Sequence, residues 1–99
     1  MPANIATGSE TMAATPVATQ IDVGFDIKWL RIVNADSGDS LEFFQDQSAA
    51  AGYKRVAAGT GAVISSGGIT IADGNRGFII GLDSDINAAS EVLFWVAIG

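Results

Sequence analysis

Three oxygen-bearing side chains, Asp83, Asp85 and Asn87, occupy alternate positions in the segment "DSDIN". This D-x-D-x-N spacing matches the first three ligand positions of an EF-hand calcium loop, and Glu91 falls at the ninth position. The glycine of the sixth position and the glutamate of the twelfth are both missing. We therefore predict a polar turn whose Asp and Asn side chains bond to their own backbone, and the three residues are only weak candidates for metal binding.

The composition argues against catalysis by the common nucleophile pairs. The chain has no histidine and no cysteine, so Ser–His and Cys–His chemistry is excluded and an ordinary zinc site is not expected. The segments "GTG" and "GGITIADG" lack the spacing and the lysine of a phosphate-binding loop. We predict a protein without catalytic residues and without a cofactor. The weakest alternative is an enzyme or metal-dependent binder that uses Asp83, Asp85 and Glu91.

The charge balance limits the partners of this 99-residue chain, whose length fits one small domain. Eleven acidic and five basic residues give a net charge of −6, and the basic residues form no run. Binding to nucleic acid or to an anionic membrane surface is therefore not expected. No apolar run reaches the roughly 20 residues of a membrane helix, and no signal peptide is recognised. These features predict a soluble protein made in the cytoplasm.

Short apolar runs separated by glycine and polar residues predict an all-β domain over residues 20–99. The segment "DQSAAAG" at 46–52 is predicted to form one helical turn. The strand spacing predicts a small antiparallel β-sandwich or barrel-like fold of about seven or eight strands. Four glycines are interpreted as turn or bulge positions: Gly68, Gly74, Gly77 and Gly81. The expected strands are 20–25, 27–34, 40–46, 53–58, 61–65, 68–73, 76–82 and 91–98.

Residues 1–19 precede this domain and show neither a helical nor a strand period. Pro16 interrupts any regular element there. We expect an extended N-terminal arm that orders against a partner through Ile5, Met12 and Val17. The alternative is a disordered tail.

The last expected strand, 91–98, is apolar on both faces. One face holds Phe94 and its neighbours at alternate positions, and the other holds Leu93 and Trp95. Either the strand is covered on both faces within one subunit, or one face meets another subunit, and the second explanation is favoured. Hydrophobic residues make up 48% of the chain and charged residues only 16%, where about 25% is ordinary. Trp95, Leu93 and Phe94 are therefore predicted to lie at an interface, with Trp95 as its anchor.

The segment from Tyr53 to Gly99 resembles a group of small virion proteins of tailed bacteriophages. Its "VAAGT" segment is followed by "SGGIT", then by "GFIIGLD", then by a closing strand with "WVA". An earlier turn, "IVNADSGDS" at 32–40, also fits the group. The resemblance covers residues 20–99, leaves out the N-terminal arm, and consists mainly of glycine and aromatic positions.

The resemblance implies a β-sandwich structural protein, and specifically a capsid decoration (cement) protein. Such proteins bind the outside of the phage capsid and brace it, so the implied partner is the major capsid protein and the implied location is the capsid exterior of the virion. The resemblance also implies a homo-oligomer, with a trimer favoured, and carries no catalytic residue. The alternative is another virion component of the same fold, such as a head fibre, a tail part or a baseplate or receptor-binding module.

Overall fold

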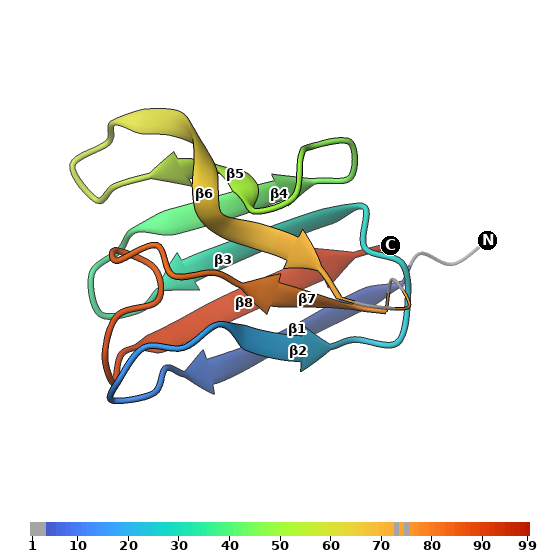
Figure 1. Ribbon diagram of the computed structural model, residues 1–99, viewed down its shortest axis with the longest axis horizontal. Coiled ribbons are helices and arrows are strands. Elements are labelled where there is room, and N and C mark those ends of the chain that lie inside the picture. Colours follow the sequence, from blue (N-terminus) through green and yellow to red (C-terminus); the bar gives the residue numbers. More distant parts are fainter. Residues whose placement is uncertain (1–3, 73, 75) are drawn as a thin grey trace.

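The computed structural model describes residues 4–72, 74 and 76–99, and these residues form an all-β fold. Eight antiparallel strands make one curled sheet, a half-barrel, in the order β1-β8-β3-β4-β5-β6-β7-β2 (Figure 1). The predicted small antiparallel all-β fold is confirmed. No helix in the described ranges has the length and apolar character needed to cross a membrane. The strands are β1 (Ile5–Thr11), β2 (Thr19–Asp22), β3 (Trp29–Asn34), β4 (Ser40–Phe44), β5 (Ala51–Arg55), β6 (Gly61–Ile71), β7 (Gly77–Ile80) and β8 (Val92–Ile98).

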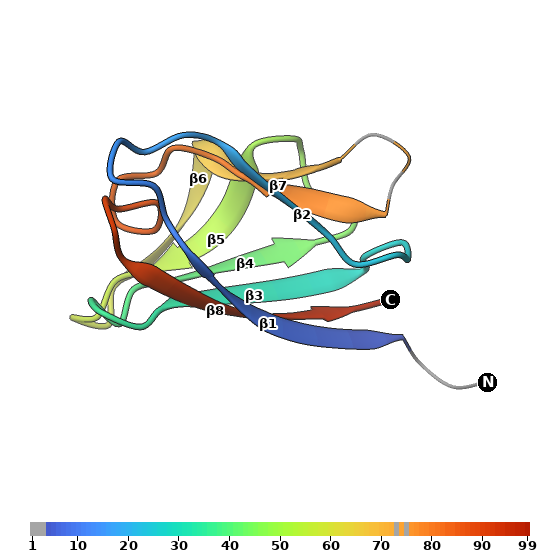
Figure 2. The ribbon, with the colours of Figure 1, turned by 90° about the horizontal axis from the view of Figure 1, so that it is seen from below.

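The sheet curls over on itself so that two layers face each other (Figure 2). Strands β1, β8, β3 and β4 form one layer, and β7 with β2 lies in the other. Strands β5 and β6 connect the layers. Because β1 and β2 end the strand order at opposite edges, no backbone ladder closes the half-barrel between them.

The corner between the layers lies where β6 passes the start of β5. Gly52 is opposite Ile64, but Ala51 is opposite Ile69, so residues 65–68 of β6 have no counterpart on β5. Like an enlarged β-bulge, this register shift leaves residues of one strand unpaired, and such irregularities bend a strand and increase its local twist. The bend lets one long strand belong to both layers.

The glycines of "SSGG" make this corner possible. Gly67 has a φ of 75°, a conformation that residues with a side chain rarely adopt. A Cβ atom on Gly68 would lie 2.1 Å from the carbonyl oxygen of Ala51, so only glycine fits there without moving backbone. The sequence predicted two strands, 61–65 and 68–73, and the structure has one bent strand instead, because these glycines bend the chain without ending the pairing.

The connections between strands are turns. The helical turn predicted at 46–52 is not formed, and the chain makes two reverse turns there, with Gln47 N donating to Phe44 O and Ala51 N donating to Ser48 O. Three further glycines interpreted as structural lie around β7. They are Gly74 with a φ of 81°, Gly77 at the start of the strand, and Gly81 directly after it.

The core fills the space between the two layers. Its largest fully buried side chains are Phe78, Leu30, Ile32, Leu41, Ile69, Ile80, Ile86 and Leu93. Phe78 of β7 meets the ring of Trp95 of β8 edge-on, with ring centroids 5.4 Å apart, so this aromatic pair joins the layers. Met12, in the connection after β1, also lies in the core and is 2% exposed.

Residues 5–11 form a strand although their sequence shows no strand period. Strand β1 pairs with β8 over its whole length, from Ile5 opposite Ile98 to Thr11 opposite Val92. The small residues of β1 allow this pairing, because a Cβ atom on Gly8 would lie 2.7 Å from the ring of Trp95. The described residues 5–11 are therefore extended and pair with the chain's own last strand, and pairing of the arm with a partner stays a prediction.

Candidate functional site

The aspartates of the D-x-D-x-N segment bind a lysine of the chain itself. The Nζ of Lys54 lies 3.0 Å from Oδ2 of Asp83 and 2.7 Å from Oδ2 of Asp85. Lys54 is on β5, and the aspartates are in the loop after β7, so the cluster ties the corner of the sheet to the second layer. The backbone N–H of Asp85 donates to Oδ2 of Asp83, which is the bond expected of a polar turn.

The remaining predicted ligands of that segment point elsewhere. Asn87 is 2% exposed, and its Nδ2 donates to the carbonyl oxygens of Val17 and Gly81 at 2.8 and 2.9 Å. Glu91 accepts a hydrogen bond from Asn34 through Oε1 at 2.9 Å. Within the described ranges, no three His, Cys, Asp or Glu side chains gather in a metal-binding geometry. In this arrangement one ammonium group bridges the two carboxylates and balances one of their two charges, and Asn87 and Glu91 tie loops together.

The aspartate pair also sets the protonation of Lys54. Burial lowers the pKa of this ammonium, but hydrogen bonds to Asp85 and Asp83 and the attraction of both carboxylates outweigh the burial and raise the pKa above 10.5. A lysine with a raised pKa stays charged at neutral pH. In that state its ammonium serves Asp83 and Asp85 as a counter-ion, whereas a general base or a nucleophile requires the free amine.

Replacement of Lys54 by methionine is expected to lower the free energy of unfolding by about 1–2 kcal/mol at neutral pH. The reason is that Asp83, whose side chain is only 13% exposed, then lacks its counter-charge. Because the folded-state pKa of Lys54 is raised, its contribution is complete below pH 10.5 and is lost as the pH rises through the folded-state value. Urea unfolding at pH 7 to 11 measures both effects.

The matched control is Lys28→Met, because Lys28 is exposed and forms no ion pair with a described residue. It is expected to change the unfolding free energy by less than about 0.5 kcal/mol. Equal losses for the two variants, or a loss for Lys54→Met that grows above pH 10.5, would contradict the role assigned to the cluster.

Asn34 is a second structural centre, and sequence reasoning missed it. Its side chain is fully buried, and its Oδ1 accepts the backbone N–H groups of Asp36 and Ser37 at 2.8 and 3.1 Å. Its Nδ2 donates to Glu91 Oε1 and to the carbonyl oxygens of the 85–86 turn. The local turn "NADSGD" is visible in the sequence, but the contacts to residues more than fifty positions away are not.

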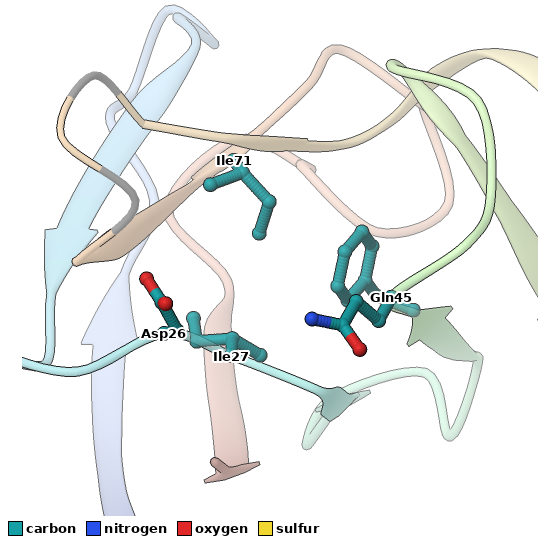
Figure 3. Close-up of a pocket in the computed structure, with 5 residues that line it drawn as sticks. Asp26, Ile27, Gln45 and Ile71 are labelled. Atoms are coloured by element: carbon teal, nitrogen blue, oxygen red, sulfur yellow. The ribbon is translucent and has the colours of Figure 1, made fainter.

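One hollow opens between the layers at an end of the half-barrel (Figure 3). It has a volume of about 170 Å³, and its lining residues are Asp26, Ile27, Phe43, Gln45 and Ile71. Ile27 and Ile71 approach it from opposite sides, and the polar groups of Asp26 and Gln45 lie at its rim (Figure 3). Small-molecule sites usually have about 300–1,000 Å³ and several converging polar groups. This hollow is too small and too open for that class, and we interpret it as the incompletely filled end of the core.

The most unusual surface is the outward side of the first layer together with the adjoining parts of β5 and β6, which we call the outer face. Cross-strand neighbours point to the same side of a sheet, so the ladder register defines its rows. The first row is Ile5, Ile98, Trp29 and Phe44; the second is Thr7, Val96, Arg31, Glu42, Tyr53 and Val63; the third is Ser9, Phe94, Val33, Ser40 and Arg55.

No described element of the chain covers the outer face, and four of its apolar side chains are exposed. The exposed fractions are 63% for Ile5, 49% for Phe44, 77% for Val63 and 55% for Phe94. Trp29 lies among them, with its indole N–H donating to Glu42 Oε2 at 3.1 Å. Large apolar side chains that gather on one face in this way are typical of an interaction surface.

The two apolar faces of β8 have different roles. Leu93 and Ala97 are fully buried in the chain's own core, and Trp95 lies on the same side against Phe78. The alternative explanation, that β8 is covered on both faces within its own subunit, is therefore wrong for the described chain, because Phe94 and its outward neighbours have no cover there. The favoured explanation, that one face meets another subunit, stays a prediction.

The predicted interface residues divide in the same way. Leu93 and Met12 are wrong as interface residues, because both are buried in the core. The ring of Trp95 packs inward against Phe78, and the residue is partly buried, so its predicted role as the interface anchor stays a prediction. Ile5 and Phe94 lie on the outer face, and Val17 is exposed in the β1–β2 connection. The sequence showed that β8 has two apolar faces but not which of them is the core side.

Comparisons were made with protein-family models, with curated proteins and with solved structures. None of them matches this chain. The described geometry therefore has to carry the functional argument. It offers an extended apolar face, a lysine–aspartate cluster and open surface hollows, including a wide polar one of about 600 Å³ lined by Gly24, Lys28 and Arg76 among others.

Proposed function

We propose that this chain is a non-enzymatic structural protein of a phage virion, a decoration (cement) protein that binds the outer surface of the capsid. The observation that carries the proposal is the uncovered outer face, with Ile5, Phe44, Val63 and Phe94 all about half exposed or more. Covering a surface of this kind with a partner is favourable, because it removes apolar area from water. The resemblance of residues 20–99 to small virion proteins supports the major capsid protein as that partner.

The charge of the outer face also supports docking. Arg31 and Arg55 face outward with a single acidic residue, Glu42, although the whole chain has a net charge of −6. The remaining surface is correspondingly more acidic than the chain as a whole. A partner surface that is apolar and mildly acidic would fit the outer face, and the acidic remainder would stay in solvent without attracting nucleic acid.

The half-barrel suits a bracing role. Its core joins two layers through the Phe78–Trp95 contact, and the Lys54 cluster and Asn34 hold the loops at its ends. Many copies on a regular lattice add their individual contacts by avidity, so each contact can be modest. The proposed protein is a homo-oligomer, in keeping with the resemblance.

The proposal predicts that the double variant Phe44→Ser, Phe94→Ser binds expanded capsids lacking the protein about thirtyfold more weakly than the wild type. Both side chains are about half exposed, so the melting temperature should change little. Co-sedimentation measures the affinity, and electron microscopy shows whether density appears at regular lattice positions.

Leu82→Ser is the matched control, because Leu82 is 58% exposed but lies outside the rows of the outer face. It should leave capsid binding unchanged. Equal binding by the double variant would reject the outer face as the docking surface. Wild-type protein that leaves capsids bare, and labels a fibre, tail or baseplate instead, would replace the decoration role with the alternative virion component.

A further inference from the structure

The outermost strand of the first layer, β1, has one side that pairs with nothing in the described chain. Gly99 N donates to Asn4 O, and Met12 N donates to Glu91 O, so the even-numbered residues of β1 hold the hydrogen bonds to β8. Backbone groups alternate in direction along an antiparallel strand. The N–H and C=O groups of the odd residues therefore point away from the sheet.

Those odd residues are Ile5, Thr7, Ser9 and Thr11, and none of their backbone groups bonds to another described residue outside the ladder. Strand β2 does not pair with them, because β2 pairs with β7 in the other layer (Figure 2). An edge of this kind is a template for another strand.

The two edges of the sheet differ in their protection. Strand β2 has only four residues, ends in Asp22, and follows Pro16, three features that discourage edge pairing. Strand β1 has seven residues, no proline, no bulge and a single charge, at Glu10. A long, regular and nearly uncharged edge is therefore open at β1 and not at β2.

We propose that β1 pairs antiparallel with β1 of a second copy of this chain, across a two-fold axis at Gly8. In this register Ile5 lies opposite Thr11 of the second copy, and Thr7 lies opposite Ser9. All four odd residues on each side then gain partners, forming about eight backbone hydrogen bonds. An axis at Thr7 or at Ser9 leaves one of the odd residues without a partner inside the strand.

The side chains of β1 fit this register. Glu10 lies opposite Ala6 of the second copy, so the only charged residue of the strand does not meet its own copy. Gly8 lies opposite Gly8 at the axis, where two side chains would crowd. The axis is perpendicular to the sheet, so the outer faces of the two copies lie on the same side and form one continuous apolar surface.

This inference rests on the homo-oligomer of the proposed function and names its contact between copies, a two-fold pairing in place of the trimer that the resemblance favours. Its test needs no capsid. In the double variant Thr7→Lys, Ser9→Lys, each introduced lysine lies opposite an introduced lysine of the second copy, and this happens twice in the dimer. Like charges directly opposite each other destabilise strand pairing. Sedimentation of the purified wild type should show a dimer, and the variant should associate about thirtyfold more weakly.

A charge-reversal experiment shows whether the lysine variant fails to associate because the strand pairing is lost or because the protein is misfolded. A mixture of Thr7→Lys, Ser9→Lys with Thr7→Glu, Ser9→Glu should restore a one-to-one dimer, because each introduced lysine then meets an introduced glutamate. The control Ala58→Lys, Thr60→Lys adds two charges in the exposed β5–β6 turn and should remain dimeric. A monomeric or trimeric wild type, an undiminished lysine variant, or a mixture that stays monomeric would overturn the pairing. None of these outcomes depends on whether the protein binds capsids.

Discussion

Replacement of Gly68 by alanine is expected to lower the free energy of unfolding by about 3–5 kcal/mol, the largest effect of any single substitution considered for this chain. The added Cβ would lie 2.1 Å from the carbonyl oxygen of Ala51 and 2.9 Å from that of Ala50. Both neighbours are backbone atoms, which cannot move aside as the end of a flexible side chain can.

The surrounding hydrogen bonds explain why the corner cannot relax. Gly68 N donates to Ala50 O at 2.9 Å, and Ala50 N donates to Ile69 O at 3.0 Å. Any shift that admits a methyl group breaks these bonds and separates β5 from β6, the strands that connect the two layers. Small domains have only about 5–15 kcal/mol of total stability, so urea unfolding and the melting temperature should both show a large loss.

Gly24→Ala is the control for this prediction. Gly24 has a φ of 87°, but no heavy atom lies within 4 Å of its would-be Cβ. Its replacement should therefore cost only the backbone strain, about 1 kcal/mol. If Gly68→Ala were no worse than Gly24→Ala, the close approach at the corner would not be what requires glycine.

The second large effect is expected for Asn34→Ala, with a loss of about 3 kcal/mol in unfolding free energy. The substitution leaves the N–H groups of Asp36 and Ser37, and Oε1 of Glu91, without their partner. Asn34 is fully buried, so water does not replace these bonds easily. Hydrogen exchange should show that the 35–38 turn and the loop before β8 open together.

Gln47→Ala provides a comparison with the same chemistry at a more exposed position. The Gln47 amide also makes two bonds to backbone, accepting from Phe44 N at 3.0 Å and donating to Ala51 O at 2.8 Å. Its loss should cost about 1 kcal/mol. Equal losses for Asn34→Ala and Gln47→Ala would mean that burial does not make Asn34 special.

Local patterns explain which elements could be predicted. Strands β3, β4, β7 and β8 contain runs of branched and aromatic residues bounded by Asp, Asn, Ser and Gly, and each was expected within a few residues of its observed position. Strand β1 has the sequence "IATGSET", which carries no apolar period. It forms a strand because β8, more than eighty residues further along the chain, offers a complete ladder and because Gly8 makes room for Trp95.

In the candidate sites, too, local features could be predicted from the sequence and long-range contacts could not. The "DSDIN" segment was predicted to be a polar turn from its own residues, and Asp83 does accept the backbone N–H of Asp85. Its cation, Lys54, lies 29 positions earlier and could not be identified, because nothing in a single sequence shows which lysine approaches which carboxylate. The three bonds that join Asn34 to the 85–91 loop were hidden for the same reason.

By itself, the sequence determined the class of the fold, the positions of most strands, the turn character of the polar segments and the fact that β8 is apolar on both sides. These properties depend on residues close together in the chain. Only the tertiary structure decided which side of β8 is the core, where Leu93 is buried and Phe94 is exposed. It also decided that β1 lies next to β8 as the last strand of the sheet, with its other side unpaired. The reason is that an edge strand is defined by its neighbours and not by its own sequence.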